Sequence, residues 1–154
     1  MKESFVKRLL LLVALFGITV SPAFCSHWVA VGNGHYVDVD TIVPKQNFEG
    51  YELNGRYYEF WTKYISNKPY KTILGKGVYA SANKVLLDCQ TRYARRLSYF
   101  AYDAQGNEII GLKMVNEQWH HIHPKTVPFE AYQFVCSGKY DLHNFKHLDS
   151  QLRH

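Results

Sequence analysis

The chain has 154 residues, of which 47% are hydrophobic and 16% aromatic, and its formal net charge is +5. This length suits one domain, with room for a targeting segment in front of it. The mildly basic charge gives no reason to expect a nucleic-acid-binding protein, which usually carries a strongly basic stripe, although it permits attraction to acidic surfaces.

The first 25 residues have the layout of a secretory signal peptide. A basic start is followed by an apolar run from Leu9 to about Val20 and then by the small residues of SPAFCS. The rival interpretation is a transmembrane anchor, but the run is shorter than the ~20 apolar residues that span a bilayer. We therefore expect an exported protein that is periplasmic, exposed at the outer-membrane surface or secreted.

The cleavage point stays open between two bonds, after Ala23 or after Cys25, since both choices leave small residues before the cut. A third alternative makes Cys25 a lipidated N-terminal residue. Phe24 in front of it is bulkier than the small residue that lipidation favours, so we do not expect a lipid anchor. Cleavage after Cys25 leaves residues 26–154 and removes Lys2, Lys7, Arg8 and Glu3, which lowers the net charge from +5 to +3.

The exported part is rich in aromatic residues and in segments that alternate between apolar and polar side chains, which indicates β-strands. Proline cannot donate to a sheet ladder, so Pro44 is expected to end a strand. In chain order we expect strands at 27–32 and 35–43, a loop or turn at 47–55, a strong strand at 56–65 and an extended connection at 66–77.

The most regular part of the sequence runs from residue 79 to residue 115. KVLLDCQTRY and RRLSYFAY alternate as strands do, either as one long bent strand or as two that separate near Ala94. The turn DAQGNE (103–108) then leads into IIGLKMV (109–115), which pairs back as a hairpin. A last short strand is expected at 118–124.

One convincing helix is predicted after Pro124. Its start is marked by Thr126 as N-cap, Pro128 in the first turn and Glu130 at the positive end of the helix dipole. Its apolar face is expected to carry Phe129, Tyr132 with Gln133, and Cys136, and its end is set by Gly138. The tail 139–154 is predicted to form a second short amphipathic helix or a frayed end.

Once Cys25 is removed, two cysteines remain, and in an exported chain they predict one disulfide between Cys89 and Cys136. The alternative is two free thiols. The bridge would close a loop of 47 residues, worth ~4 kcal/mol in the chain-entropy model. On its strand Cys89 would share a face with Val85, Leu87, Thr91 and Tyr93. The predicted fold class is therefore α+β, an antiparallel sheet of about six strands with the C-terminal helix packed on one face and tied by the disulfide.

Three stretches, WVAVG with HYVDVDTI, LLDCQTRYARRLSYFAYDAQG and WHHIHPKTVPFEAYQFVC, follow one another in an order that resembles the surface-adhesin E family of small exported bacterial proteins. The resemblance runs from about Trp28 to Cys136. It implies a signal peptide at 1–25, an adhesin E-like domain at 26–138 and a tail at 139–154. It further implies a six-stranded antiparallel sheet with a disulfide-tethered helix, a homodimer as one arrangement, and adhesion to host matrix or serum proteins such as vitronectin, laminin and plasminogen.

The segment RYARR and its neighbours predict a basic and aromatic patch for contact with an acidic host protein or glycan. The alternative is a solubilising outer face that protects a strand edge. The residues of this candidate patch are Lys84, Arg92, Arg95, Arg96 and Tyr99.

The histidine cluster HHIH offers a second candidate site, because His121 and His123 project to one face of a strand and can supply two metal ligands. A third ligand would have to come from His35, His143 or His147. The alternative is a row of solvated histidines on an edge strand. If the histidines bind a metal, the protein would be a periplasmic metal-handling or accessory protein. The adhesin function, in contrast, requires no cofactor.

Two further groupings have ordinary structural explanations. The aromatic run at 57–64 suits either an exposed contact surface or cross-strand packing. Asp38 and Asp40 could act as paired carboxylates, but capping of local backbone amides explains them as well. With no phosphate-binding loop, nucleophile elbow or Cys-His spacing in the sequence, we predict a binding protein and not an enzyme.

Overall fold

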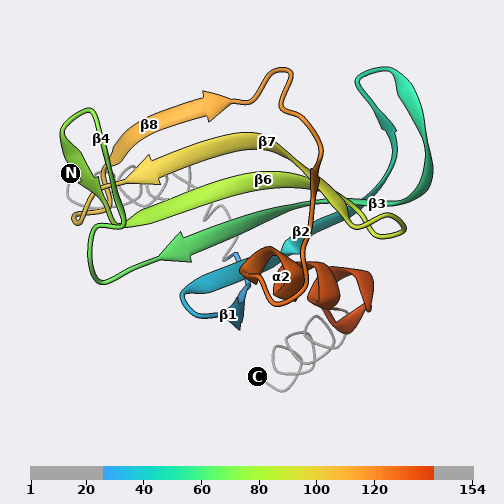
Figure 1. Ribbon diagram of the computed structural model, residues 1–154, viewed down its shortest axis with the longest axis horizontal. Coiled ribbons are helices and arrows are strands. Elements are labelled where there is room, and N and C mark those ends of the chain that lie inside the picture. The colour runs from blue at the N-terminus through green and yellow to red at the C-terminus, as the bar shows by residue number, and fades with distance from the viewer. Residues whose placement is uncertain (1–25, 141–154) are drawn as a thin grey trace, which may run out of the picture.

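The computed structural model describes residues 26–140, which form a curved antiparallel sheet with one complete helix beside it (Figure 1). The spatial order of the sheet is β1-β2-β3-β6-β7-β8, and β9 pairs with the start of β7. The elements are β1 (Trp28–Gly32), β2 (His35–Phe48), β3 (Tyr51–Ile65), β4 (Lys71–Ile73), β5 (Lys76–Val78), β6 (Ala80–Asp88), β7 (Tyr93–Tyr102), β8 (Glu108–Lys113), β9 (His120–His121) and α2 (Val127–Cys136).

The longest strands, β2 and β3, form a hairpin that extends further than the sequence predicts. Pro44 does not end β2 but sits within it, opposite Tyr58. β1 pairs with β2 only as far as Asp38, so at Pro44 the other edge of β2 has no neighbouring strand. The N–H that proline lacks is therefore not needed for a sheet hydrogen bond. The predicted loop at 47–55 shrinks to a two-residue turn at Glu49 and Gly50, whose φ angles are 50° and 83°.

The strand that was expected to carry Cys89 ends one residue earlier, at Asp88. The Asp88 carboxylate accepts hydrogen bonds from the backbone N–H groups of Gln90 and Thr91, at 2.8 and 3.3 Å, and so draws the chain into a turn. The placement of Cys89 on a strand face with Thr91 was therefore wrong. Of the two alternatives left open, two strands is correct, with the break before Tyr93 instead of near Ala94.

The expected connection at 66–77 contains a small hairpin of its own, β4–β5, which forms a separate two-stranded sheet. Its turn residues Leu74 and Gly75 have φ angles of 50° and 75°, the positive values that a tight hairpin turn requires. The strands expected near 27–32, 56–65, 109–115 and 118–124 are present as β1, β3, β8 and the two-residue β9.

Helix α2 begins after Thr126 as predicted, but the Thr126 side chain makes no cap hydrogen bond to the helix. Its hydroxyl group instead donates to the carbonyl oxygen of His123, at 2.6 Å. The predicted Phe129, Tyr132 and Cys136 pack against the main core, whereas Gln133 is exposed. The most deeply buried helix residues, Phe134 and Val135, were not predicted. The predicted tail lies outside the described residues after Tyr140.

The main core brings the helix and the sheet together. Phe134 and Val135 of α2 join one cluster with strand residues and with Ile122 from the segment before the helix. The predicted disulfide between Cys89 and Cys136 is present, with Cα atoms 5.5 Å apart. The strand residues of the cluster are Val37, Val39, Phe60 and Leu87.

A second, smaller cluster lies at the other end of the sheet and anchors the β4–β5 hairpin. Val78, Tyr99 and Ala101 are its buried members, and Ile73 packs against them. The fold is thus mostly antiparallel sheet with one complete C-terminal helix and one disulfide. Among residues 26–140, no helix has the length and apolar character needed to cross a bilayer.

Candidate functional site

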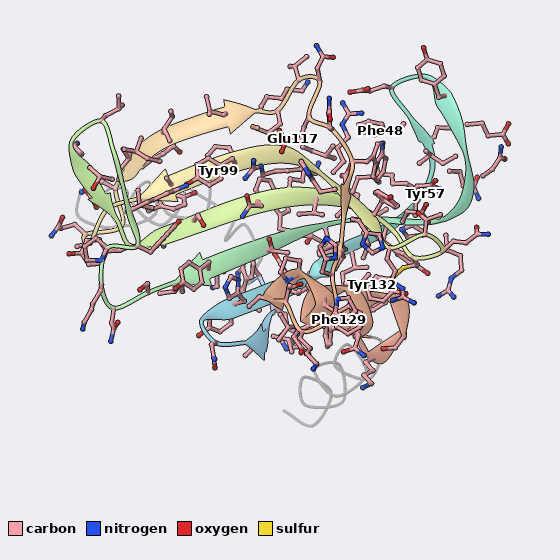
Figure 2. The ribbon with its side chains drawn as sticks, viewed as in Figure 1. Phe48, Tyr57, Tyr99, Glu117, Phe129 and Tyr132 are labelled. Atoms are coloured by element: carbon pink, nitrogen blue, oxygen red, sulfur yellow. A yellow bond between two sulfur atoms is a disulfide. The ribbon has the colours of Figure 1, made fainter. Side chains whose placement is uncertain are left out.

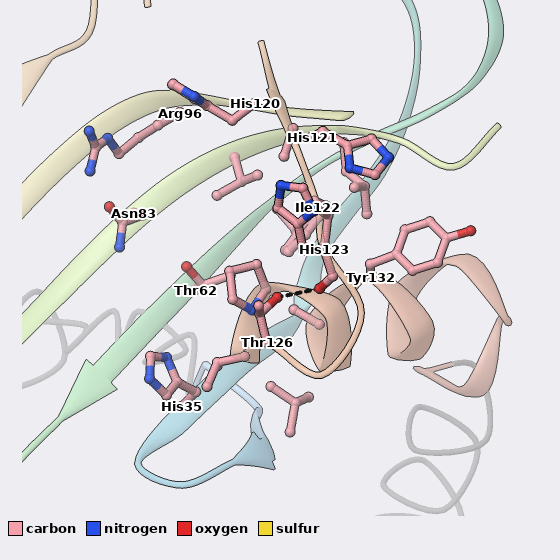
Figure 3. Close-up of a pocket in the computed structure, with 18 of the residues that line it drawn as sticks. His35, Thr62, Asn83, Arg96, His120, His121, Ile122, His123, Thr126 and Tyr132 are labelled. Atoms are coloured by element: carbon pink, nitrogen blue, oxygen red, sulfur yellow. Dashed lines mark hydrogen bonds between the residues drawn. The ribbon is translucent and has the colours of Figure 1, made fainter. Parts of the chain in front are cut away.

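A groove of about 680 Å³ opens between the sheet and the segment that leads into α2 (Figure 3). We call this segment, Glu117–Thr126, the strap. The lining is largely apolar, with a few polar side chains among the aliphatic ones. The sheet contributes Phe60, Thr62, Asn83, Val85, Leu87, Ala94 and Arg96, the strap contributes Glu117 and the HHIH run, and α2 contributes Val127, Pro128, Ala131 and Tyr132.

Backbone bonds and one apolar anchor hold the strap in place. His120 and His121 pair with Ala94 and Tyr93 of β7, and the N–H of Ile122 donates to the carbonyl oxygen of Arg92 at 2.8 Å. The Ile122 side chain is 5% exposed and belongs to the main core. Burial of such a side chain stabilises its position by about 2 kcal/mol, so the strap is a fixed wall of the groove.

The polar groups of the groove gather at Arg96. Its guanidinium group donates to Glu117 at 3.1 Å and lies over the ring of Tyr99, 5.4 Å from the ring centroid. Glu117 also approaches the imidazole of His120 at 3.6 Å. The Nε atom of Arg96 is buried without a hydrogen-bond partner. The groove therefore combines an apolar floor with one charged and partly unsatisfied corner.

The histidine prediction is met only in part. The rings of His121 and His123 lie 5.0 Å apart, edge to face. His35 also lines the groove, but its ring stacks on Tyr64 at 4.3 Å, and burial lowers its pKa. Within the described part of the chain, no three His, Cys, Asp or Glu side chains are close enough to hold a metal ion. The other two suggested ligands, His143 and His147, lie outside the described residues.

The predicted basic patch does not form one surface. Lys84 pairs with Glu59 at 2.8 Å, and it points away from its neighbour Val85, which lines the groove. Arg95 makes two 3.3 Å bonds to Glu49. Arg92 is exposed in the β6–β7 turn. The pairing of β6 with β7 places Arg96 and the buried Tyr99 on one face of the sheet, where they are in contact, and Lys84 and Arg95 on the other face. Whether any of the five candidate residues binds a partner stays a prediction.

A strand irregularity explains why Arg96 and Tyr99 meet. Arg96 stands opposite Val85 and Tyr99 stands opposite Asn83, with Leu97 as an extra residue between the paired positions. Val85 and Asn83 are two apart on β6 and so share a face. The bulge at Leu97 therefore turns two residues of odd spacing to the same side of the sheet, which simple alternation does not predict. Figure 2 shows Tyr99 on β7 and Glu117 on the strap above it.

The remaining candidates have structural roles. Phe60 is in the main core and Trp61 packs on Phe100 with ring centroids 5.8 Å apart, as cross-strand packing predicts. The buried Asp38 carboxylate accepts the N–H of Asp40 at 3.3 Å. Burial raises the pKa of Asp38. These contacts support local capping over paired-carboxylate chemistry.

Sequence reasoning missed the small residues that make the groove hollow. Ala94 on β7 and Ala131 on α2 both line it, and a larger side chain at either position would occupy part of the space. Glu117, the partner of Arg96, was also missed. Its position three residues before His120 gives no signal for the contact with Arg96, because Arg96 lies 21 residues away on β7 and reaches the same Oε1 atom that His120 approaches.

Two solved structures of Haemophilus influenzae protein E share this fold. Crystal form II aligns with a TM-score of 0.50 and 17% identity, covering 68% of this chain and 81% of that chain. The selenomethionine form aligns with a TM-score of 0.50 and 14% identity, covering 71% and 85%. Curated protein sequences give no significant match.

The family comparison is more direct. The model of the surface-adhesin protein E family matches residues 28–137, which is most of the chain and spans every strand, the strap and α2. The match begins at the first strand and ends just after Cys136, the helix end of the disulfide. The chain therefore belongs to the surface-adhesin protein E family.

Proposed function

We propose that this protein is an exported bacterial binding protein that contacts host extracellular proteins of the vitronectin, laminin or plasminogen class. Family membership supports an adhesin-like surface protein over an enzyme. The signal-like segment at 1–25 supports export, to the outer-membrane surface in this proposal. The adhesin would act through its surface and needs no cofactor.

The groove is the contact site that we favour, and one observation carries this choice. It offers about 680 Å³ of largely apolar space with a charged corner at Arg96. Binding sites are typically clefts of roughly 300–1,000 Å³ with a few convergent polar groups. In a protein complex, such a cleft receives an apolar or aromatic anchor side chain of the partner.

A capture experiment with matched variants tests the groove. Ala131→Leu places a larger side chain inside it, while Gln133→Leu adds the same side chain at an exposed position of the same helix. We expect immobilised vitronectin, laminin or plasminogen to capture the parent protein and Gln133→Leu equally, and Ala131→Leu at least tenfold more weakly. Equal capture of all three proteins would remove the groove from the proposal, and no capture at all would remove the partner class.

The same experiment separates the groove from the predicted basic surface. Arg92 is exposed and forms no salt bridge among the described residues, so Arg92→Glu changes surface charge without breaking an internal contact. The groove proposal predicts unchanged capture by Arg92→Glu. Weaker capture by this variant alone would place the contact on the β6–β7 turn.

Cell-surface exposure is tested independently. Proteolysis of intact cells should cleave an adhesin, whereas a protein that is protected until the outer membrane is breached does not act as one. The latter result would favour the periplasmic alternative, a metal-handling protein. That alternative is supported by the 5.0 Å approach of His121 and His123, and calorimetric titration with Zn²⁺ or Cu²⁺ tests it, because absence of stoichiometric heat would exclude it.

A further inference from the structure

The β4–β5 hairpin presents an exposed leucine in a backbone conformation that leucine disfavours. Leu74 is 79% exposed, more than any other large hydrophobic side chain in the described part of the chain. Its φ angle is 50°, and Gly75 follows at 75°. Asn and Gly suit such a turn, whereas a branched apolar residue is strained there. Neither folding nor solubility explains this choice of residue.

The base of the hairpin is fixed, so the tip is held out from a firm support. Val78 is fully buried and packs with Tyr99 and Ala101, while Ile73 closes over them. The N–H of Tyr70 donates to the carbonyl oxygen of Val78 at 3.1 Å. In Figure 1 the hairpin lies at the end of the sheet away from α2, so it is separate from the groove.

The charged side chains of the hairpin and of the segment before it are basic: Lys76 adjoins the tip, Lys71 lies at the base opposite Val78, and Lys68 precedes β4. Lys68, Lys71 and Lys76 are exposed, and none of them forms a salt bridge within residues 26–140. The sequence has no Asp or Glu between Glu59 and Asp88. The Lys71 ammonium group lies over the Tyr99 ring at 4.4 Å, which anchors its stem and keeps the charge beside the hairpin.

One carboxylate lies near this charge. Asp103, in the β7–β8 turn, receives hydrogen bonds from Asn107 that lower its pKa, and Lys76 adds a smaller attraction. The attraction offsets part of the charge of Lys76 and leaves Lys68 and Lys71 without a described acidic partner. An exposed apolar tip, with one lysine beside it and two uncompensated lysines at and before the base of the hairpin, matches a surface that is negative outside and apolar beneath, which is the arrangement of an anionic lipid layer.

We propose that the β4–β5 hairpin docks on an anionic lipid surface, with Leu74 inserted among the acyl chains and the lysines at the phosphate level. The contact is distinct from the proposed host-protein contact in the groove. The hairpin would hold the protein at a membrane surface. This contact requires neither a membrane-spanning helix nor a lipid on Cys25. A second protein is the alternative occupant, and the test below separates the two.

Vesicle co-sedimentation of the exported protein, residues 26–154, tests the proposal. We expect binding to vesicles that contain phosphatidylglycerol, weak binding to pure phosphatidylcholine, and loss of binding as salt is raised. Leu74→Asn should weaken binding about tenfold, because it removes the inserted side chain. Asn suits the turn, so this variant should melt no lower than the parent.

Matched controls make the outcome decisive. Leu112→Asn removes another exposed leucine, on β8, and should bind as the parent does. Lys68→Ser with Lys76→Ser should weaken binding to anionic vesicles only, whereas Lys113→Ser with Lys125→Ser should leave it within about twofold of the parent.

No binding to anionic vesicles, or equal binding by Leu74→Asn and the parent, would overturn the proposal. Failure here leaves capture through the groove untouched, because Ala131 lies in a different part of the molecule.

Discussion

Tyr132 donates a hydrogen bond from its hydroxyl group to the carbonyl oxygen of Cys89, at 3.3 Å. Cys89 is also the residue that the disulfide joins to Cys136, one helical turn further along α2. Two successive turns of the helix are thus attached to one residue of the β6–β7 turn. The two attachments hold one wall of the groove against the sheet, and their removal should have separable effects.

Replacing Cys89 and Cys136 together by Ser should lower the free energy of unfolding by about 4 kcal/mol, because the bridge restricts the unfolded chain over a loop of 47 residues. Tyr132→Phe should lower it by about 1 kcal/mol, since one hydrogen bond is lost and the ring remains. Urea denaturation of the three proteins measures both. An unchanged midpoint for the double Ser variant would show that the bridge does not restrain the helix.

Arg95 should contribute more to stability than its neighbour Arg92. Its side chain is 12% exposed, bonds Glu49 twice and lies over the Phe48 ring at 5.0 Å, so it fastens the end of the β2–β3 hairpin to β7. Arg95→Ala should reduce the free energy of unfolding by about 1–2 kcal/mol through lost packing and hydrogen bonds. Arg92→Ala should stay within about 0.5 kcal/mol of the parent.

Reversing Arg92, Arg95 and Arg96 to Glu together would not be a clean test of the basic patch. Arg95 and Arg96 both have carboxylate partners, Glu49 and Glu117. The triple reversal would set like charges against each other and lower the melting temperature. A binding defect in that variant would then report on folding, whereas Arg92→Glu alone reports on the surface.

Stability should fall as the pH is lowered from 7 towards 5, partly because of His35. Burial lowers the pKa of His35 below its ordinary value of 6.5. The unfolded chain therefore takes up a proton at this residue before the folded chain does, so the stability contributed by neutral His35 is present above 6.5 and is lost as the pH falls below it. His35→Phe keeps an aromatic ring beside Tyr64 and cannot ionise. It should show a shallower decrease in urea midpoint between pH 7 and pH 5.

Gly34 should tolerate no side chain. A Cβ atom there would lie 2.4 Å from the carbonyl oxygen of Ile65, and the φ angle of 72° is itself unfavourable for alanine. Gly106 has a φ angle of 81° but open space around it, so it isolates the backbone effect. Gly34→Ala should destabilise the protein by about 2 kcal/mol more than Gly106→Ala. Equal thermal midpoints would contradict the close packing of the β1–β2 turn against β3.

The sequence predicted the strands best where alternation was uninterrupted and worst where one residue changed the direction of the chain. The segment 56–65 was recognised because its pattern reflects burial of one face, and β3 contains it whole. The end of β6 was missed because the Asp88 side chain bonds the following N–H groups, an interaction that competes with the strand. The prediction that Pro44 ends a strand was wrong, because a proline interrupts a sheet only where another strand lies on the side of its missing N–H.

For the candidate site, the sequence singled out Arg96 and the histidines of the strap, but neither the other residues of the groove nor their grouping. Five residues were assigned to one basic surface, yet three of the four cations have separate carboxylate partners, at Glu49, Glu59 and Glu117. These partners lie far away in the sequence or on the neighbouring strand, and no local pattern identifies them. The groove itself was not predicted, since its lining combines residues of the sheet, the strap and α2 that only the fold brings together.

The sequence by itself determined the class of the fold and its covalent link. Strand alternation, the N-terminal signals of one helix and two cysteines are local or countable properties, and together they specified an antiparallel sheet tied to a C-terminal helix. Only the tertiary structure decided which side chains share a surface. The bulge at Leu97 puts Arg96, which lines the groove, on the same face of the sheet as Tyr99, while Arg95 lies on the other face and bonds Glu49. One extra residue in a strand reverses the facing of everything beyond it, and that shift depends on pairing with β6.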